Sequence, residues 1–157
     1  MRLFEYTVQR HGWLIHAYAQ LTTHFHLLVW TPEDNLSCGM QLLCGIYAQV
    51  FNREHARKGH LVTGRFMSVV VERPGHALEV CRYIALNPVR AGLCRSPEEW
   101  IWSSYRATVG LASSPSFLER DWLLGLFDRD PLVAVERLRA FVDAGAAGVR
   151  PLQPADP

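Results

Sequence analysis

The stretch His24-Phe25-His26-Leu27-Leu28-Val29-Trp30 carries most of the information about the fold and the chemistry of this chain. Its apolar and aromatic residues predict a β-strand, in which residues two apart project from the same face. His24 and His26 are therefore expected to lie side by side, with Phe25 on the opposite face. Two adjacent imidazoles can share one divalent metal ion, although two histidines on one sheet face also occur without a metal.

The segments around this strand predict alternating helices and strands. Residues 3–11 predict a short helix that stops at Gly12, and residues 13–19 predict a strand that pairs with 24–30 through a tight connection. Apolar residues at helical spacing predict a helix from 36 to about 54. A Val-rich run predicts a further strand over 66–72, and a helix over 76–87 is expected to stop at Pro88.

This order of elements predicts an α+β fold with a ferredoxin-like antiparallel or mixed sheet whose first strand is missing. Strands 24–30 and 66–72 could then pair in parallel through the helix between them, or a partner chain or the tail could fill the gap. We assign residues 1–110 to a catalytic domain, 111–148 to a C-terminal helical extension and 149–157 to a disordered tail. In the extension, Asp130 and Pro131 predict a helix start, and Gly145 predicts its stop.

The composition is that of one soluble domain, because 49% of the 157 residues are hydrophobic and 20% are charged. No apolar run approaches the ~20 residues of a membrane span, and the N-terminus lacks a secretory pattern, so we expect a cytoplasmic protein. The four cysteines form no CxxC pair and are expected to be reduced thiols, mostly core residues and not zinc ligands.

The net charge is only +1, but the basic residues are clustered. Local positive patches can bind phosphates in a nearly neutral chain, although a solvated basic loop is an equally ordinary interpretation. The clustered residues are Arg53, His55, Arg57, Lys58, His60 and Arg65, with Arg82, Arg90 and Arg95 further along.

Tyr83 and Asn87 are four residues apart, so they share one face of the predicted helix. An Asn87 amide oxygen could complete a metal site begun by two imidazoles, while the Tyr83 oxygen attacks a phosphodiester. The ordinary interpretations are a packed or surface tyrosine and an asparagine that ends a helix. Tyr47 is a rival tyrosine, but its spacing with Leu43 and Val50 predicts a core position.

Two further residues have open roles. Glu79 lies one turn before Tyr83 and either touches the metal or faces solvent. His16 lies on the neighbouring strand and either supports the metal ligands or simply packs.

Four segments, followed by Trp102-Ser103-Ser104-Tyr105, resemble the single-tyrosine HUH transposases (His, hydrophobe, His), most closely their REP-associated branch. The likeness covers about residues 14–110. The four segments are Thr23-His24-Phe25-His26-Leu27-Leu28-Val29, Tyr47-Ala48-Gln49-Val50-Phe51-Asn52-Arg53, Gly59-His60-Leu61-Val62-Thr63-Gly64-Arg65-Phe66 and Tyr83-Ile84-Ala85-Leu86-Asn87-Pro88-Val89-Arg90-Ala91-Gly92-Leu93.

The resemblance implies an enzyme that cuts and rejoins hairpin-bearing single-stranded DNA. Tyr83 would form a 5′-phosphotyrosine, and His24, His26 and Asn87 would bind Mg²⁺ or Mn²⁺. Such enzymes act without a membrane, as monomers or homodimers. We expect DNA contacts from Arg53, Arg57, Lys58, Arg65 and Arg90.

The sequence departs from the family in two places. Thr23 stands where the family has asparagine, and the opening strand is missing. Two rival functions follow: an inactive relative that only binds structured single-stranded DNA, and a metal hydrolase that uses water in place of Tyr83.

Overall fold

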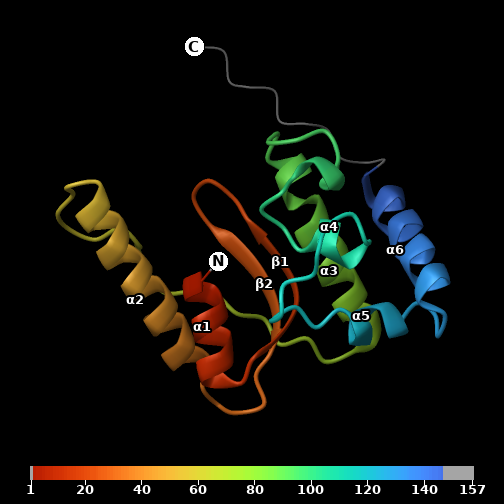
Figure 1. Ribbon diagram of the computed structural model, residues 1–157, viewed down its shortest axis with the longest axis horizontal. Coiled ribbons are helices and arrows are strands. Elements are labelled where there is room, and N and C mark those ends of the chain that lie inside the picture. The colour runs from red at the N-terminus through yellow and green to blue at the C-terminus, as the bar shows by residue number, and fades with distance from the viewer. Residues whose placement is uncertain (1, 147–157) are drawn as a thin grey trace. The chain divides into compact units, whose positions relative to one another are not determined.

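The computed structural model describes residues 2–146 and is a mixed α+β protein (Figure 1). The described residues group into two compact units. The first comprises residues 2–14 and 30–70, and the second comprises 15–29 and 71–146. No helix within the described residues is long and apolar enough to cross a membrane. The tail predicted at 149–157 lies outside the described residues.

The first unit contains α1 (Arg2–His11) and α2 (Leu36–Glu54), both confirmed as predicted. Trp13 follows α1 in the chain, packs against Gly39 of α2 and is only 2% exposed. Its indole nitrogen donates a hydrogen bond of 2.7 Å to the Asn35 side chain, whose own amide group donates to the His11 carbonyl at 2.9 Å. Asn35 therefore precedes α2, but its side chain bonds to Trp13 and to the end of α1 and does not cap α2.

The buried face of α2 is confined to its first half. Met40 and Leu43 are buried there, and an added Cβ on Gly39 would lie 2.1 Å from the Trp13 ring. Tyr47 is 47% exposed, so the prediction that it belongs to the core is wrong. The reason is length: α1 has 10 residues and α2 has 19, so α1 cannot cover the C-terminal half of α2.

The strand predicted over 66–72 does not form. These residues make no ladder with any described strand, and Met67 and Val70 are 96% and 80% exposed. Strand preference reflects packing on a half-buried sheet more than an intrinsic backbone tendency, so a Val-rich run without a partner stays irregular. The predicted parallel pairing with residues 24–30 is therefore also wrong.

The second unit is built around an antiparallel hairpin of β1 (Leu14–Gln20) and β2 (Phe25–Trp30), as predicted. The other edge of β1 is covered by later segments. The Ser104 amide donates to the Tyr18 carbonyl at 2.9 Å, and the Glu119 amide donates to the Ile15 carbonyl at 2.8 Å. Among the described residues, no bridge joins the other edge of β2.

Helix α3 (Pro74–Arg90) is longer at both ends than predicted. Pro74 occupies its first turn, where a missing amide proton costs nothing. Pro88 does not stop the helix, which ends at Arg90 and is followed by Gly92 in the left-handed region with φ of 69°. Pro88 deprives the Ile84 carbonyl of one partner, but the next turn still forms, because the Ala91 amide reaches the Asn87 carbonyl at 2.9 Å.

The remaining helices pack in the same unit. They are η1 (Pro97–Glu99), α4 (Tyr105–Thr108), α5 (Asp121–Gly125) and α6 (Pro131–Ala146). Asp130 caps α6 as predicted, since its carboxylate accepts the Leu132 amide at 2.9 Å. Gly145 lies inside α6 and does not stop it. Figure 1 shows α6 beside α3, which it contacts, so the predicted helical extension is part of this unit.

The core of the second unit lies between the hairpin, α3 and α6. Leu28 of β2 and Ile84 of α3 are buried in it, together with Leu138 of α6. This packing fixes α3 against the face of β2 that carries Leu28, which is also the face of the two histidines. The fold thereby places the predicted nucleophile and the predicted ligands in one unit.

Candidate active site

The two histidines meet at the start of β2. His24 immediately precedes the strand, and its carbonyl accepts the Leu21 amide at 2.8 Å, which closes the hairpin connection. The rings of His24 and His26 have centroids 4.9 Å apart and stand at 90° to each other. The predicted side-by-side placement is confirmed.

Thr23 contacts the first histidine. Its hydroxyl oxygen lies 3.1 Å from His24 Nδ1, a distance at which Nδ1 can donate its proton to the hydroxyl. That tautomer leaves Nε2 of His24 with a free lone pair for a ligand. Thr23 therefore provides a hydrogen bond that orients the first histidine.

Tyr83 lies against the second histidine. Its ring centroid is 5.3 Å from that of His26, at an interplanar angle of 81°, and the residue is 44% exposed. The neighbouring residues Ile84 and Ala85 face the core, so the helix places Tyr83 at the margin between core and solvent. A phenol that is both beside the histidines and open to solvent can reach an external substrate.

Asn87 completes the cluster from the next turn of α3. It is 8% exposed, and its side chain is close enough to His26 to raise the pKa of that ring. Burial and the charge of His24 are the larger effects and lower the pKa of His26 below its ordinary value. His26 is therefore neutral at neutral pH, as a metal ligand must be.

The donor set fits a divalent cation. Nε2 of His26 is buried and has no hydrogen-bond partner among the described residues, and in the tautomer with the proton on Nδ1 its lone pair is free for a ligand. No group of three or more His, Cys, Asp or Glu side chains gathers anywhere in residues 2–146. Two imidazoles and an amide would leave most coordination positions of Mg²⁺ or Mn²⁺ to water and phosphate oxygens, as is usual for Mg²⁺.

Arg90 contacts the Tyr83 ring directly, and the sequence did not predict this contact. Its guanidinium carbon lies 5.3 Å from the centroid of the Tyr83 ring. A shallow open groove of about 320 Å³ runs along the same helix. Glu79 and Arg82 form an ion pair in its wall, so Glu79 faces solvent instead of the histidines. The groove is lined by His76, Glu79, Val80, Arg82, Tyr83 and Arg90.

His76 was missed by the sequence reasoning. It lies seven residues before Tyr83, which is two helical turns, and that spacing alone places it on the same face. Because Glu79 pairs with Arg82, the uncompensated positive charge beside the exposed Tyr83 comes from Arg90, and such a charge favours a phosphodiester.

The other predicted DNA contacts belong to the first unit. Arg53 lies in the last turn of α2, and Arg57, Lys58 and Arg65 lie in the loop that follows it. All four are exposed. The structure gathers these arginines and the lysine in one segment, separate from the unit that carries Tyr83.

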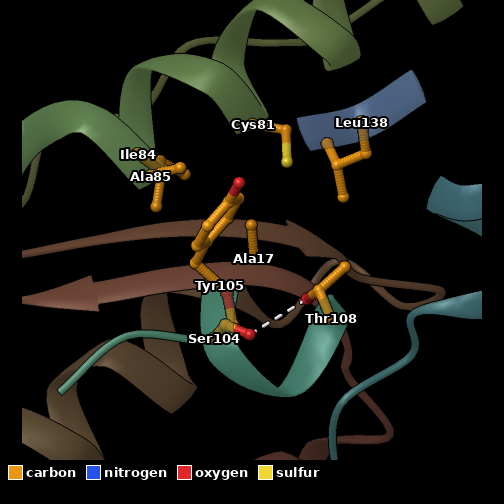
Figure 2. A pocket seen from close by; sticks show the side chains of 8 residues that line it. All are labelled: Ala17, Cys81, Ile84, Ala85, Ser104, Tyr105, Thr108 and Leu138. Atoms are coloured by element: carbon orange, nitrogen blue, oxygen red, sulfur yellow. Dashed lines mark hydrogen bonds between the residues drawn. The ribbon is translucent and has the colours of Figure 1, made fainter. Parts of the chain in front are cut away.

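Two tyrosines of the second unit are unsuited to act as nucleophiles. Tyr105 is 3% exposed and borders a small internal cavity of about 10 Å³, where its hydroxyl points toward α3 (Figure 2). Burial, assisted by the charges of Glu98 and Asp143, raises its pKa. Burial also raises the pKa of Tyr18. Within this unit, Tyr83 is the accessible phenol.

His16 packs instead of supporting the metal ligands. It is 5% exposed, its Nδ1 lies 3.1 Å from the Glu119 carbonyl oxygen, and its ring centroid is 4.4 Å from that of Trp122. Burial lowers its pKa, and the bond to the Glu119 carbonyl and the charge of Glu119 partly offset this. Because Trp122 belongs to α5, the His16 ring ties β1 to that helix.

The lowered pKa of His16 predicts an acid-sensitive stability. As the pH falls below the ordinary value of ~6.5, the unfolded chain binds a proton before the folded protein does, so the free energy of unfolding decreases. Denaturant unfolding at neutral and at more acidic pH, for wild type and His16→Asn, measures this. We expect a smaller pH-dependent loss in His16→Asn, and an identical loss in both proteins would contradict the assignment.

The cysteines have mixed environments. Cys81 is buried, Cys38 is exposed, and all four are free thiols. Burial raises the pKa of Cys81 to about 12, so this thiol is protonated and acts as an apolar core residue. The prediction that most of the cysteines belong to the core is confirmed fully for Cys81 alone, since Cys44 and Cys94 are half-buried and Cys38 is exposed.

Comparisons with known proteins give no identification. No protein-family model, no curated protein and no solved structure matches this chain.

Proposed function

We propose that this protein is a tyrosine transposase-type enzyme that cuts and rejoins hairpin-bearing single-stranded DNA. The observation that carries the proposal is the convergence of His24, His26 and Tyr83, with ring centroids 4.9 and 5.3 Å apart. These residues come from a strand and from a helix far along the chain, and the fold brings them together at a solvent-accessible position.

The proposed reaction is a transesterification at phosphorus. The Tyr83 oxygen attacks the phosphodiester, a bond forms from that oxygen to phosphorus, and the bond from phosphorus to the 3′ oxygen breaks. The phenol proton passes, in the net reaction, to the departing 3′ oxygen. The products are a 5′-phosphotyrosine and a free 3′-hydroxyl, and attack by another 3′-hydroxyl on the phosphotyrosine rejoins the DNA.

The protein residues prepare this step in three ways. His24, His26 and Asn87 would hold Mg²⁺ or Mn²⁺, which when bound neutralises charge on the scissile phosphate. Arg90 restrains the Tyr83 ring through its contact with the ring face and adds positive charge beside it. The groove along α3 offers His76 and Arg82 to the neighbouring backbone phosphates.

We also propose that the fold is a variant of the ferredoxin-like fold, because β1, β2, α2 and α3 follow one another in this order along the chain. One observation favours the rival in which the protein binds DNA without cutting it. The outer edge of β2, the strand that follows His24, has no bridge to another described strand. An uncovered edge leaves the backbone that positions the histidines less restrained.

A covalent-adduct assay tests the proposal. Wild type, Tyr83→Phe and Tyr6→Phe are incubated with Mn²⁺ and a pool of 3′-labelled hairpin oligonucleotides with randomised single-stranded flanks. Tyr6 is a matched control, because it is 49% exposed against 44% for Tyr83. We expect a labelled protein band under denaturing conditions for wild type and Tyr6→Phe, and its complete loss in Tyr83→Phe.

Each alternative outcome contradicts the proposal in a recognisable way. DNA binding by wild type without any adduct identifies the binding-only rival. Cleavage that survives in Tyr83→Phe identifies hydrolysis by water. An adduct that persists in Tyr83→Phe assigns the nucleophile to another residue.

A further inference from the structure

Three rings form a column along the C-terminal half of α2 and its C-cap residue, His55. Tyr47, Phe51 and His55 are spaced four residues apart, so they lie one above the other on one face of the helix. The centroids of Tyr47 and Phe51 are 6.0 Å apart, and those of Phe51 and His55 are 4.0 Å apart with the ring planes within 14°. Tyr47 and His55 are exposed, and Phe51 is half-buried between them.

This column does not contribute to the core. The buried residues of α2 are Gly39, Met40 and Leu43, all in its first half. A tyrosine ring stabilises a protein when it is buried, and this stabilisation is lost when the ring is exposed to water. A smaller polar residue would serve as well at an exposed position. The column is therefore an aromatic surface that lies outside the core of its own unit.

The surroundings of the column are strongly basic. Arg57 places its guanidinium carbon 5.9 Å from the Phe51 ring centroid. Between residues 51 and 65 the single carboxylate is Glu54, and no described ion pair engages the arginines or the lysine of this segment. The basic residues are Arg53, His55, Arg57, Lys58, His60 and Arg65.

The loop after α2 is held in a defined shape. The Asn52 side chain donates a hydrogen bond of 2.8 Å to the Gly59 carbonyl, and the Arg57 amide donates to the Asn52 carbonyl at 2.8 Å. Ala56 adopts a left-handed φ of 50° between them, which turns the chain sharply. These bonds keep Arg57 next to the Phe51 ring, so positive charge and aromatic surface are preorganised together.

We propose that Tyr47, Phe51 and His55 form a base-stacking platform for unpaired nucleotides of single-stranded DNA. Exposed aromatic faces bind bases by stacking, while neighbouring cations follow the phosphate backbone. Base faces are hidden inside a duplex, so the platform selects single-stranded segments. The choice of DNA as the ligand rests on the proposed function, and it makes this platform a second contact in addition to the groove on α3.

Fluorescence anisotropy with a labelled oligothymidylate tests the platform. All proteins carry Tyr83→Phe, so that no covalent adduct forms. We expect Tyr47→Leu and His55→Ala each to weaken binding at least about fivefold, because base stacking on an aromatic residue is typically worth that much or more. Tyr47→Trp should retain wild-type affinity, since it restores an aromatic face.

A control and a second ligand separate stacking from general effects. Trp102→Ala removes a ring that is 51% exposed and has Glu98 and Glu99 near it in the chain, and it should change the affinity less than twofold. A blunt DNA duplex should bind Tyr47→Leu and wild type equally. Arg53→Gln should weaken the binding of both the single strand and the duplex. It should also lower the salt dependence of binding by the amount that corresponds to about one phosphate contact.

Three results would overturn the platform. They are unchanged oligothymidylate binding in Tyr47→Leu and His55→Ala, an equal loss for duplex and single strand, and binding of RNA of matching sequence but not of DNA. Failure of the platform is distinguishable from failure of the proposed function. If wild type forms the adduct but the ring substitutions leave oligothymidylate binding unchanged, the platform alone is rejected. If the ring substitutions weaken binding but wild type forms no adduct, the tyrosine chemistry alone is rejected.

Discussion

Replacing both His24 and His26 with alanine is expected to reduce Mn²⁺-dependent adduct formation by about a thousandfold or more. The two imidazoles are the strongest donors in the cluster, and the donor that remains, Asn87, is a neutral amide. Losing preorganised electrostatic stabilisation of a developing charge typically costs about 10²–10³ in rate, and here two ligands are removed at once. Adduct yield over time, measured with wild type and the double variant, gives the ratio.

A second measurement separates loss of the metal from loss of the fold. Titration with Mn²⁺, followed by the paramagnetic signal of the free ion, should show weaker binding in the double variant. His60→Ala is a suitable control, because His60 is exposed in the loop after α2. Oligothymidylate binding should stay unchanged in the double variant, since neither histidine belongs to the base-stacking platform. Undiminished adduct formation, or unchanged Mn²⁺ affinity, would reject the metal-ligand assignment.

Local sequence patterns predicted the local parts of the candidate site. The two-residue period of a strand placed His24 beside His26, and the four-residue spacing of a helix placed Asn87 beside Tyr83. Neither pattern could predict that α3 packs on the histidine face of β2. That contact depends on long-range burial of Leu28, Ile84 and Leu138, and only the resemblance to a known family suggested it in advance.

The wrong predictions share a physical cause, which is the absence of a tertiary partner or the presence of an unforeseen one. Residues 66–72 have strand-forming side chains but no neighbouring strand among the described residues, so they remain exposed. Tyr47 continues the apolar spacing of α2, but α1 is too short to cover it. Pro88 was expected to end α3, yet burial of Leu86 and Val89 in the same unit keeps the last turn helical. Periodicity shows which side chains could be buried, and only packing determines which are.

Leu138→Ala is expected to lower the free energy of unfolding by about 3 kcal/mol, which is typical of a large buried residue cut back to alanine. Leu138 is 0% exposed and lines the small cavity between α6 and α3, together with Cys81 and Tyr105 (Figure 2). Removing its side chain enlarges that cavity instead of allowing the helices to close it. For a chain of this length, the midpoint of thermal unfolding should fall by roughly 10 °C.

Leu132→Ala is the matched control for this prediction. Leu132 lies on the same helix but is 78% exposed, so its replacement should change the free energy of unfolding by less than about 0.5 kcal/mol. Chemical denaturation of both variants, followed by tryptophan fluorescence, measures the difference. Equal effects of the two substitutions would show that α6 is not packed on α3. Because α3 carries Tyr83 and Asn87, Leu138→Ala should also lose adduct formation at a lower temperature than wild type, and Leu132→Ala should not.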